Sequence, residues 1–319
     1  MTPPQRIASL LPSATEILWG LGLASRVVAV SHECDYPPET ATRPRATRSR
    51  IDSTQASGQI DEQVQSRLAA GQPLYELDAA LLRRLVPDLI VTQAQCDVCA
   101  VRLADVQDLV RTAPELATAQ VLALEPSGLT DVLSDILRIG RFAGAETAAQ
   151  QYNRQLQARV EDVRQRTGAL PAAKRPRVVC IEWTEPLMTA GNWVPELISM
   201  AGGQPCLAEA EKHSGYVSWE AIRACQPEVV IVAPCGFDLV RTVEEAAALA
   251  DLPGWRALPA VHNGRCFALD GNAYLNRSGP RLVDSLEILA HVIQPELFST
   301  PPIAESEPKP FARLDVGGS

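Results

Sequence analysis

Two cysteines, Cys96 and Cys99, follow a run that reads as a buried strand, Pro87 to Thr92. A C-x-x-C turn at such a place can close a disulfide, lower a thiol pKa for redox chemistry, or supply two zinc ligands. His32 and Cys34 end a neighbouring predicted strand, so four nitrogen and sulfur ligands could meet at one metal ion. A structural zinc site usually needs a second cysteine pair at similar spacing, which this sequence lacks. We therefore rank plain packing or a redox pair ahead of zinc.

Other loops that follow predicted strands collect side chains that turns rarely need. They include Glu33, Trp183, Trp193, His213, Tyr216, Cys235, Phe237, Tyr274 and Arg277. A wall of aromatic rings with a few hydrogen-bonding groups suits a large, partly flat ligand. His213 is either an axial ligand to a chelated metal or a histidine hydrogen-bonded within its loop, and we favour the second.

Charge and motif content disfavour several classes of protein. The net charge is −9, whereas nucleic-acid binders normally carry a basic face, so we expect no nucleic-acid partner. The patterns Gly-x-Ser-x-Gly, G-x-G-x-x-G and G-x-x-x-x-G-K-[ST] are absent, which weakens hydrolase, dehydrogenase and NTPase functions. No run reaches the roughly 18 apolar residues of a membrane span.

The N-terminal residues, MTPPQRIASLLPSATE, contain no charged segment, apolar core or cleavage site of a signal peptide. We therefore expect a cytoplasmic location for the chain as it stands, and a periplasmic or cell-surface location if a leader has been removed. Eight cysteines, of which only Cys96 and Cys99 are close in sequence, agree with a reducing compartment.

A long helix is predicted from Ala145 to Thr167, where there is no proline and no glycine. Apolar residues recur at three- and four-residue steps, and about 23 residues span roughly 35 Å of helix. A segment of similar size lies on each side, and each begins with a short β-type run, Arg6 to Leu11 and Arg177 to Trp183. Alternating strands and helices with short connections favour parallel sheets covered on both faces.

We therefore expect an α/β fold of two Rossmann-like lobes with mainly parallel sheets, joined by a single long helix. The predicted parts are an N-terminal lobe (1–144), a connecting helix (145–168), a C-terminal lobe (169–298) and a disordered tail (299–319) rich in Pro, Glu and Ser. Ligands of such sheets gather beyond the C-terminal ends of the strands, so the unusual loops should lie on facing edges.

Some local predictions are less definite. Ser13 and Glu16 fit a capping box for a helix from Ala14 to Leu21. The polar stretch from Ala41 to Gly71 gives no clear element. The segments His213 to Tyr216 and Asp270 to Gly279 are predicted to be loops.

Several motifs in order resemble the iron-siderophore and cobalamin substrate-binding proteins of ABC importers, most closely the cobalamin-binding branch. They cover about residues 5–295 and comprise RIASLLPSATE (6–16), DYPP (35–38), PDLIV (87–91), TAG (189–191), AGG (201–203) and SGPR (278–281). The resemblance implies two α/β lobes joined by a long helix, a corrinoid or metal chelate held between them, and no catalysis.

The resemblance also implies a ligand, partners and site residues. Cobalamin is the expected ligand, an ABC permease is a candidate partner, and we expect a monomer. Asp35, Tyr36 and Gln93 would line one wall of the cleft, Trp183, Tyr216, Phe237 and Tyr274 the other, and Arg277 would meet amide side chains or the phosphate of the corrinoid.

The chain departs from the family pattern at some positions. Importer-docking members present one surface Glu on each lobe; Glu220 matches the second, but Ala80 stands at the first. Glu33 and Gln93 stand where cobalamin binders have aromatic residues. The runner-up function is therefore a thiol- or metal-dependent enzyme or metal chaperone that uses His32, Cys34, Cys96 and Cys99.

Overall fold

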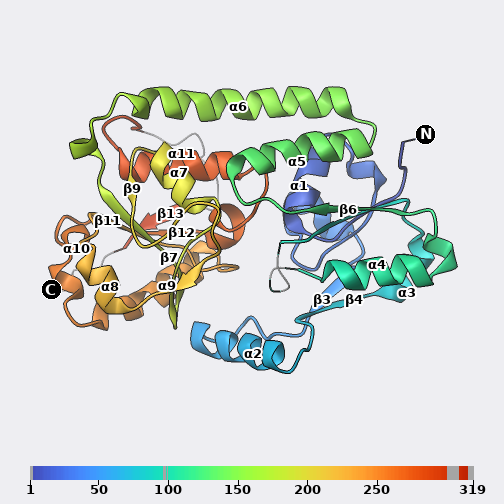
Figure 1. Ribbon diagram of the computed structural model, residues 1–319, viewed down its shortest axis with the longest axis horizontal. Helices are drawn as coiled ribbons and strands as arrows, with labels where there is room; N and C mark the ends of the chain where they lie inside the picture. Colours follow the sequence, from blue (N-terminus) through green and yellow to red (C-terminus); the bar gives the residue numbers. More distant parts are fainter. Residues whose placement is uncertain (1–2, 96–97, 99, 300–308, 315–319) are drawn as a thin grey trace. The chain divides into compact units, whose positions relative to one another are not determined.

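The computed structural model describes residues 3–95, 98, 100–299 and 309–314. The chain divides into two compact units. Unit 1 consists of Met1–Gln55, Gln59–Pro126 and Thr130–Leu156, and unit 2 of Ala56–Gly58, Ser127–Leu129 and Gln157–Ser319. A single 23-residue helix, α6 (Glu146–Gly168), begins in unit 1 and ends in unit 2. The fold class expected from the sequence, two α/β units joined by one long helix, is confirmed (Figure 1).

The sheet of unit 1 is parallel throughout. Its strands lie in the order β2-β1-β5-β6 and comprise β1 (Ile7–Ser9), β2 (Val27–Val30), β5 (Leu89–Gln93) and β6 (Gln120–Leu124). Its helices are α1 (Pro12–Gly20), α3 (Ala79–Leu85), α4 (Leu103–Thr112) and α5 (Leu129–Phe142). Leu82 of α3 and Val106 of α4 pack with Ile90 of β5 in one apolar cluster, so these helices cover one face of the sheet.

One local prediction in unit 1 is wrong, and one stretch without a predicted element contains a helix and a strand. Helix α1 begins at Pro12, its N-cap is Leu11, and no side chain caps it, so Ser13 is a helical residue and forms no capping box. Proline suits this first position because its fixed φ matches the helix and its missing N–H would have no partner there. The stretch from Ala41 to Gly71 contains β3 (Thr47–Ser49), which pairs with β4 (Tyr75–Leu77), and α2 (Ser57–Ala69). Helix α2 is rich in Gln and mostly polar, so its apolar periodicity is too weak to indicate a helix.

The sheet of unit 2 has a parallel centre and antiparallel flanks. Strands β7 (Arg177–Thr184), β11 (Val229–Val232) and β12 (Cys266–Leu269) are parallel neighbours, and β9 (Gln204–Pro205) adds to β7 in the same sense. The antiparallel strands are β8 (Leu187–Thr189), β10 (Gly215–Tyr216) and β13 (Phe311–Arg313). The parallel pairing was predicted, whereas the flanking strands were not, because each has only two or three residues.

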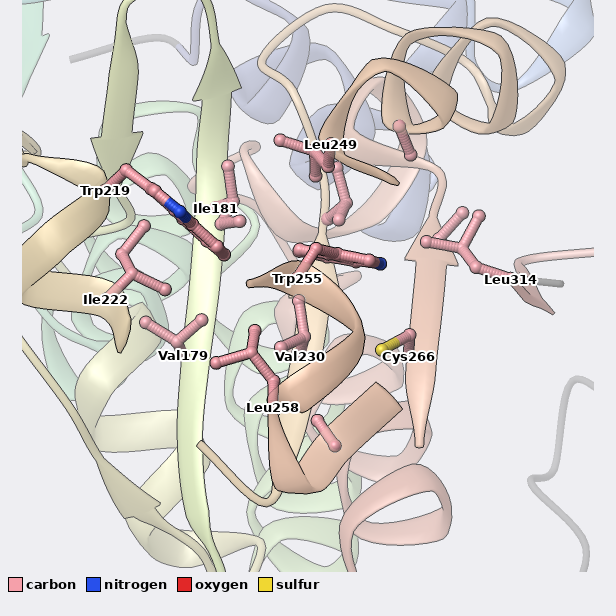
Figure 2. Packing of buried hydrophobic residues seen from close by; sticks show 14 residues of the cluster. Val179, Ile181, Trp219, Ile222, Val230, Leu249, Trp255, Leu258, Cys266 and Leu314 are labelled. Carbon is pink, nitrogen blue, oxygen red and sulfur yellow. The ribbon is translucent and has the colours of Figure 1, made fainter. Parts of the chain in front are cut away.

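Helices cover both faces of this sheet (Figure 1). They are α7 (Val194–Met200) and α11 (Leu282–Ile293) on one face, and α8 (Trp219–Ala224), α9 (Leu239–Ala246) and α10 (Pro259–His262) on the other. Figure 2 shows the second face, where Trp255 lies over Val230 and near Cys266. Trp219 and Trp255 approach with ring centroids 5.8 Å apart. This core fixes the strand ends from which the site loops leave.

The C-terminal segment corrects one prediction. Disorder was expected over residues 299–319, yet Phe311–Arg313 form β13, which pairs with β12. Leu314 is 6% exposed and belongs to the unit 2 core. Strand β12 would otherwise leave its outer edge unpaired, and pairing satisfies those backbone groups whatever the composition of the added strand. Residues 300–308 and 315–319 lie outside the described part.

Among the described residues, none of the helices combines the length and apolar character needed to cross a bilayer.

Candidate functional site

Aromatic and basic side chains lie at the C-terminal ends of the parallel strands β7, β11 and β12 of unit 2. Trp183 lies near the end of β7, and Phe237 lies in the loop between β11 and α9. Their ring centroids are 5.2 Å apart at an interplanar angle of 55°, a favourable tilted arrangement. The guanidinium of Arg241 lies 3.5 Å from the centroid of the Phe237 ring. Phe237 is only 2% exposed, so it supports the Trp183 ring from the interior.

Tyr216 is connected to Trp183 by strand register. Met188 of β8 stands opposite Trp183 on one side and opposite Tyr216 of β10 on the other. Directly opposed residues of neighbouring strands point to the same face of a sheet, and two strand spacings separate the two aromatic residues by about 10 Å. The Tyr216 side chain is 57% exposed.

The segment after β12, predicted as a loop, contains a short π-helix from Gly271 to Leu275. Asp270 caps it by accepting a hydrogen bond from the Ala273 N–H at 2.6 Å. Asn272 links this segment to the preceding loop, because its N–H donates to the Phe237 carbonyl oxygen at 3.0 Å. π-Helical turns are rare and often occur at functional sites.

Tyr274 and Arg277 are positioned by this segment. Arg277 is 7% exposed and donates from Nη2 to Oδ1 of Asn272 at 2.8 Å. The Tyr274 ring faces the guanidinium of Arg281 at 5.5 Å. The structure thus brings Trp183 and Phe237 together and ties Tyr274 and Arg277 to the same loop system.

A carboxyl group lies next to this aromatic pair. Glu182 accepts a hydrogen bond from the Ser214 hydroxyl at 2.7 Å, and Ser214 Oγ accepts the N–H of Gly191 at 3.0 Å. Burial raises the pKa of Glu182 to about 7, while the hydrogen bond from Ser214 opposes the shift. This carboxyl group therefore joins the strand that holds Trp183 to the segment that holds Tyr216.

Sequence reasoning missed three of these residues. Arg241 follows Phe237 by four residues, which is the spacing that brings side chains together at the start of a helix. Arg281 closes the SGPR motif, which was noted for its family resemblance and not for its charge. Glu182 gave no signal, because only the fold shows that Ser214 lies beside it.

Other predicted loop residues of unit 2 have different environments. Trp193 is buried, and its Nε1–H donates to the Leu275 carbonyl oxygen at 2.8 Å, so it supports the π-helix. His213 and Cys235 are exposed. An axial-ligand role for His213 stays a prediction.

In unit 1, Gln93 ends β5 and is 5% exposed, and its Oε1 accepts the Gln95 N–H at 2.6 Å. Asp35 and Tyr36 are exposed in the loop after β2. Arg45 shapes this loop by donating to the Cys34 carbonyl oxygen at 2.6 Å. Asp35 and Tyr36 are therefore accessible to solvent, whereas Gln93 is buried.

The proposed metal ligands are only partly described. The His32 Nδ1 lies 2.7 Å from Thr47 Oγ1, and burial lowers the His32 pKa, with the Arg45 charge as a smaller cause. Cys34 is buried, with its sulfur 3.1 Å from Thr15 Oγ1. Cys96 and Cys99 lie outside the described residues. Within the described ranges, no group of three or more His, Cys, Asp or Glu side chains could hold a metal ion.

The residues considered for docking have distinct environments. Glu220 is exposed on α8. Ala80 is exposed on α3, and the neighbouring Asp78 is used as the N-cap of that helix, accepting the Leu81 N–H at 2.8 Å. Glu76 pairs with Arg50 at 3.6 Å. The carboxylates of Asp78 and Glu76 therefore already have partners within unit 1, and neither stands at the position of Ala80.

Sequence relatives cover most of the chain. The chain is 26% identical over 292 residues to the vitamin B12-binding protein of Vibrio cholerae serotype O1, covering 89% of this chain and 87% of that protein. It is 23% identical over 300 residues to the uncharacterized ABC transporter substrate-binding lipoprotein YvrC of Bacillus subtilis, covering 92% of this chain and 82% of that protein.

Solved structures show the same fold. The periplasmic vitamin B12 binding protein BtuF of Vibrio cholerae matches with a TM-score of 0.67 and 23% identity, covering 92% of this chain and 97% of that chain. The periplasmic heme-binding protein RhuT from Roseiflexus sp. RS-1 matches with a TM-score of 0.69 and 24% identity, covering 92% and 99%.

The family model described as periplasmic binding protein matches residues 7–273, which is most of the chain. The chain therefore belongs to the periplasmic binding protein family and is related to the vitamin B12-binding branch of the substrate-binding proteins of ABC importers.

Proposed function

We propose that this protein binds cobalamin or a related corrinoid as the substrate-binding component of uptake or as a carrier, without catalysing a reaction. The observation that carries the proposal is the aromatic pair Trp183–Phe237 at the C-terminal strand ends of unit 2, with Arg277 and Tyr274 tethered to the same loops. A corrinoid is a large macrocycle with amide side chains and a phosphate. Aromatic faces and a few fixed donors suit such a ligand.

Each side chain has a proposed role. Trp183, Tyr216 and Tyr274 contact the macrocycle, and Phe237 supports Trp183 from behind. Arg277, held by Asn272, meets amide groups or the phosphate. For unit 1, the family resemblance assigns Asp35, Tyr36 and Gln93 to ligand contact, and the proposal includes these three residues.

Heme is the competing ligand class. It is also a flat, metal-containing macrocycle, and heme-binding proteins are among the structures with the same fold. It differs from a corrinoid in carrying carboxylates at its rim in place of many amides. Arg241, Arg277 and Arg281 near the aromatic pair would suit carboxylates as well, so direct titration must separate the two ligands.

Docking to a permease is a second part of the proposal. Glu220 is exposed on α8 and is available to a basic partner surface. Since unit 1 presents Ala80 at the matching position, we expect docking to depend on Glu220 more than in family members with two carboxylates.

Calorimetric titration of the purified chain with cyanocobalamin, and separately with hemin, tests the ligand. We expect saturable one-to-one binding of the corrinoid and a change in its visible spectrum. Saturable binding of hemin without binding of the corrinoid would refute the corrinoid assignment and leave a heme-binding function. Arg277→Gln tests the proposed arginine contact in the same titrations. Arg256→Gln, which removes an exposed arginine outside the site loops, is its matched control.

A further inference from the structure

Two cysteines that are far apart in sequence lie together in unit 2. Cys206 follows β9, and Cys225 is the C-cap of α8. Both are half-buried, and the two thiols lie close enough to influence each other electrostatically. In the reduced chain Cys206 Sγ donates to the Gln204 carbonyl oxygen at 3.9 Å and Cys225 Sγ to the Ile222 carbonyl oxygen at 3.2 Å. We propose that Cys206 and Cys225 are a disulfide-forming site that cross-links β9 to the end of α8.

The backbone near both cysteines is anchored to the start of β7. The Cys206 N–H donates to the Val178 carbonyl oxygen at 2.8 Å, which continues the pairing of β9 with β7. The Cys225 carbonyl oxygen accepts from Nε of Arg177 at 3.1 Å. Both cysteines are therefore tied to neighbouring residues of β7, Cys206 through a backbone hydrogen bond and Cys225 through the Arg177 side chain.

The charged groups around the pair distinguish the two thiols. Burial raises the pKa of both, to about 12 for Cys225, while the Arg177 guanidinium lowers both values. Glu228, which pairs with Arg177 at 3.4 Å, opposes this effect at Cys206. Because the pKa of Cys225 is raised to about 12 and its thiol donates to the Ile222 carbonyl oxygen, Cys206 is the thiol that ionises first and acts as the nucleophile.

The chemistry is thiol–disulfide exchange with a small disulfide oxidant such as glutathione disulfide. The Cys206 thiolate attacks one sulfur, the oxidant's S–S bond breaks, and one glutathione thiolate leaves. Cys225, after losing its proton to solvent, then attacks Cys206 Sγ in the mixed disulfide and releases the second glutathione. Two protein thiols are oxidised to one disulfide, and one glutathione disulfide is reduced to two thiols.

The cross-link would close the segment 206–225, which contains Ser214, Tyr216 and Glu220. A closed loop of about 20 residues restricts the unfolded chain and so stabilises the folded one. This inference does not depend on which ligand the protein binds.

Peptide mapping without reduction tests the site. The full chain is incubated with glutathione disulfide, its remaining thiols are alkylated, and it is cleaved after glutamate. This cleavage separates Cys206 (197–209) from Cys180 and separates Cys225 (221–228) from Cys235. We expect the cross-linked pair 197–209/221–228, lost on reduction, and a rise of roughly 5–10 °C in the melting temperature.

Matched variants sharpen the result. Cys206→Ser and Cys225→Ser should each abolish the cross-link, whereas Cys235→Ser, which changes an exposed cysteine, should retain it. Recovery of Cys206 and Cys225 as alkylated thiols or as separate glutathione adducts in the oxidised wild-type chain would overturn the proposal. Because that outcome is read on the wild-type chain, it does not require any variant to fold.

Discussion

Arg159 of α6 donates two hydrogen bonds to the carboxylate of Glu287 of α11, from Nε to Oε1 at 2.9 Å and from Nη2 to Oε2 at 2.5 Å. The same guanidinium donates to Asp284 at 2.5 Å. Glu287 is 8% exposed, and these contacts raise the pKa of Arg159 above its ordinary range. The connecting helix is thus held to the last helix of unit 2 by one arginine and two carboxylates, of which Arg159 remains 36% exposed.

Arg159→Ala should destabilise the protein by roughly 2–4 kcal/mol, because it leaves two carboxylates without their shared cation. Arg154→Ala, which removes an exposed arginine from the same helix, should change the unfolding free energy by less than about 0.5 kcal/mol. Urea unfolding followed by circular dichroism measures both. Equal effects of the two substitutions would show that the Arg159 pair contributes little.

Stability should depend on pH through Glu182. Its pKa rises from 4.5 in the ordinary state to about 7 in the folded protein. Between these values the folded state holds a proton that the unfolded state releases. The contribution of Glu182 to stability is therefore fully present below pH 4.5, falls as the pH rises towards 7, and does not change further above that. The loss of unfolding free energy due to Glu182 between pH 4.5 and pH 7 is at most about 3 kcal/mol.

Glu182→Gln should remove this component of the pH dependence, whereas Glu209→Gln, at an exposed position, should keep it. Melting temperatures recorded between pH 4 and pH 8 give the comparison. An unchanged slope in Glu182→Gln would mean that the pKa of Glu182 is the same in the folded and unfolded states.

Gly271→Ala should disturb the segment that carries Tyr274 and Arg277. A Cβ at this position would collide with the Pro234 carbonyl oxygen, which is backbone and cannot easily move. We expect a loss of about 1–3 kcal/mol in stability, together with weaker ligand binding. Gly215→Ala is the matched control, since nothing lies within 4 Å of its added Cβ. Thermal unfolding of both variants, with calorimetric titration, would contradict the prediction if they behaved alike.

Replacing Trp183 or Tyr274 by Ala should weaken cobalamin binding by roughly 1–3 kcal/mol, the scale of losing a large aromatic contact. Val240→Ala on α9, a change at a side chain that is 69% exposed, should leave the affinity unchanged. Titration calorimetry measures all three. Full affinity in both aromatic variants, with folding intact, would exclude this wall from the site.

Metal analysis of protein purified without chelator tests the cysteine pair Cys96 and Cys99. We expect no stoichiometric zinc, and we expect the Cys96→Ser, Cys99→Ser double variant to bind cobalamin as the original chain does. Stoichiometric zinc that disappears in the double variant would favour the metal-dependent function instead. Weaker retention of that zinc as the pH falls would support thiolate ligation.

Strong periodic patterns allowed the sequence to predict the main elements. The buried run Val229–Val232 and the long charged helix α6 carry enough local information, because burial and helical periodicity are repeated over many residues. The family motifs indicated the cobalamin-binding branch of the substrate-binding proteins. The positions of loops after parallel strands indicated which side chains lie at the same edge of a sheet.

Only the tertiary structure decided which distant residues meet. The Ser214 hydroxyl reaches Glu182, and Cys206 lies beside Cys225, although no local pattern relates either pair. Strand β13 exists because the edge of β12 supplies backbone partners, while its own three residues carry little signal. Hydrogen bonding and burial across long sequence separations depend on the packed sheet, and for that physical reason they could not be derived from neighbouring residues alone.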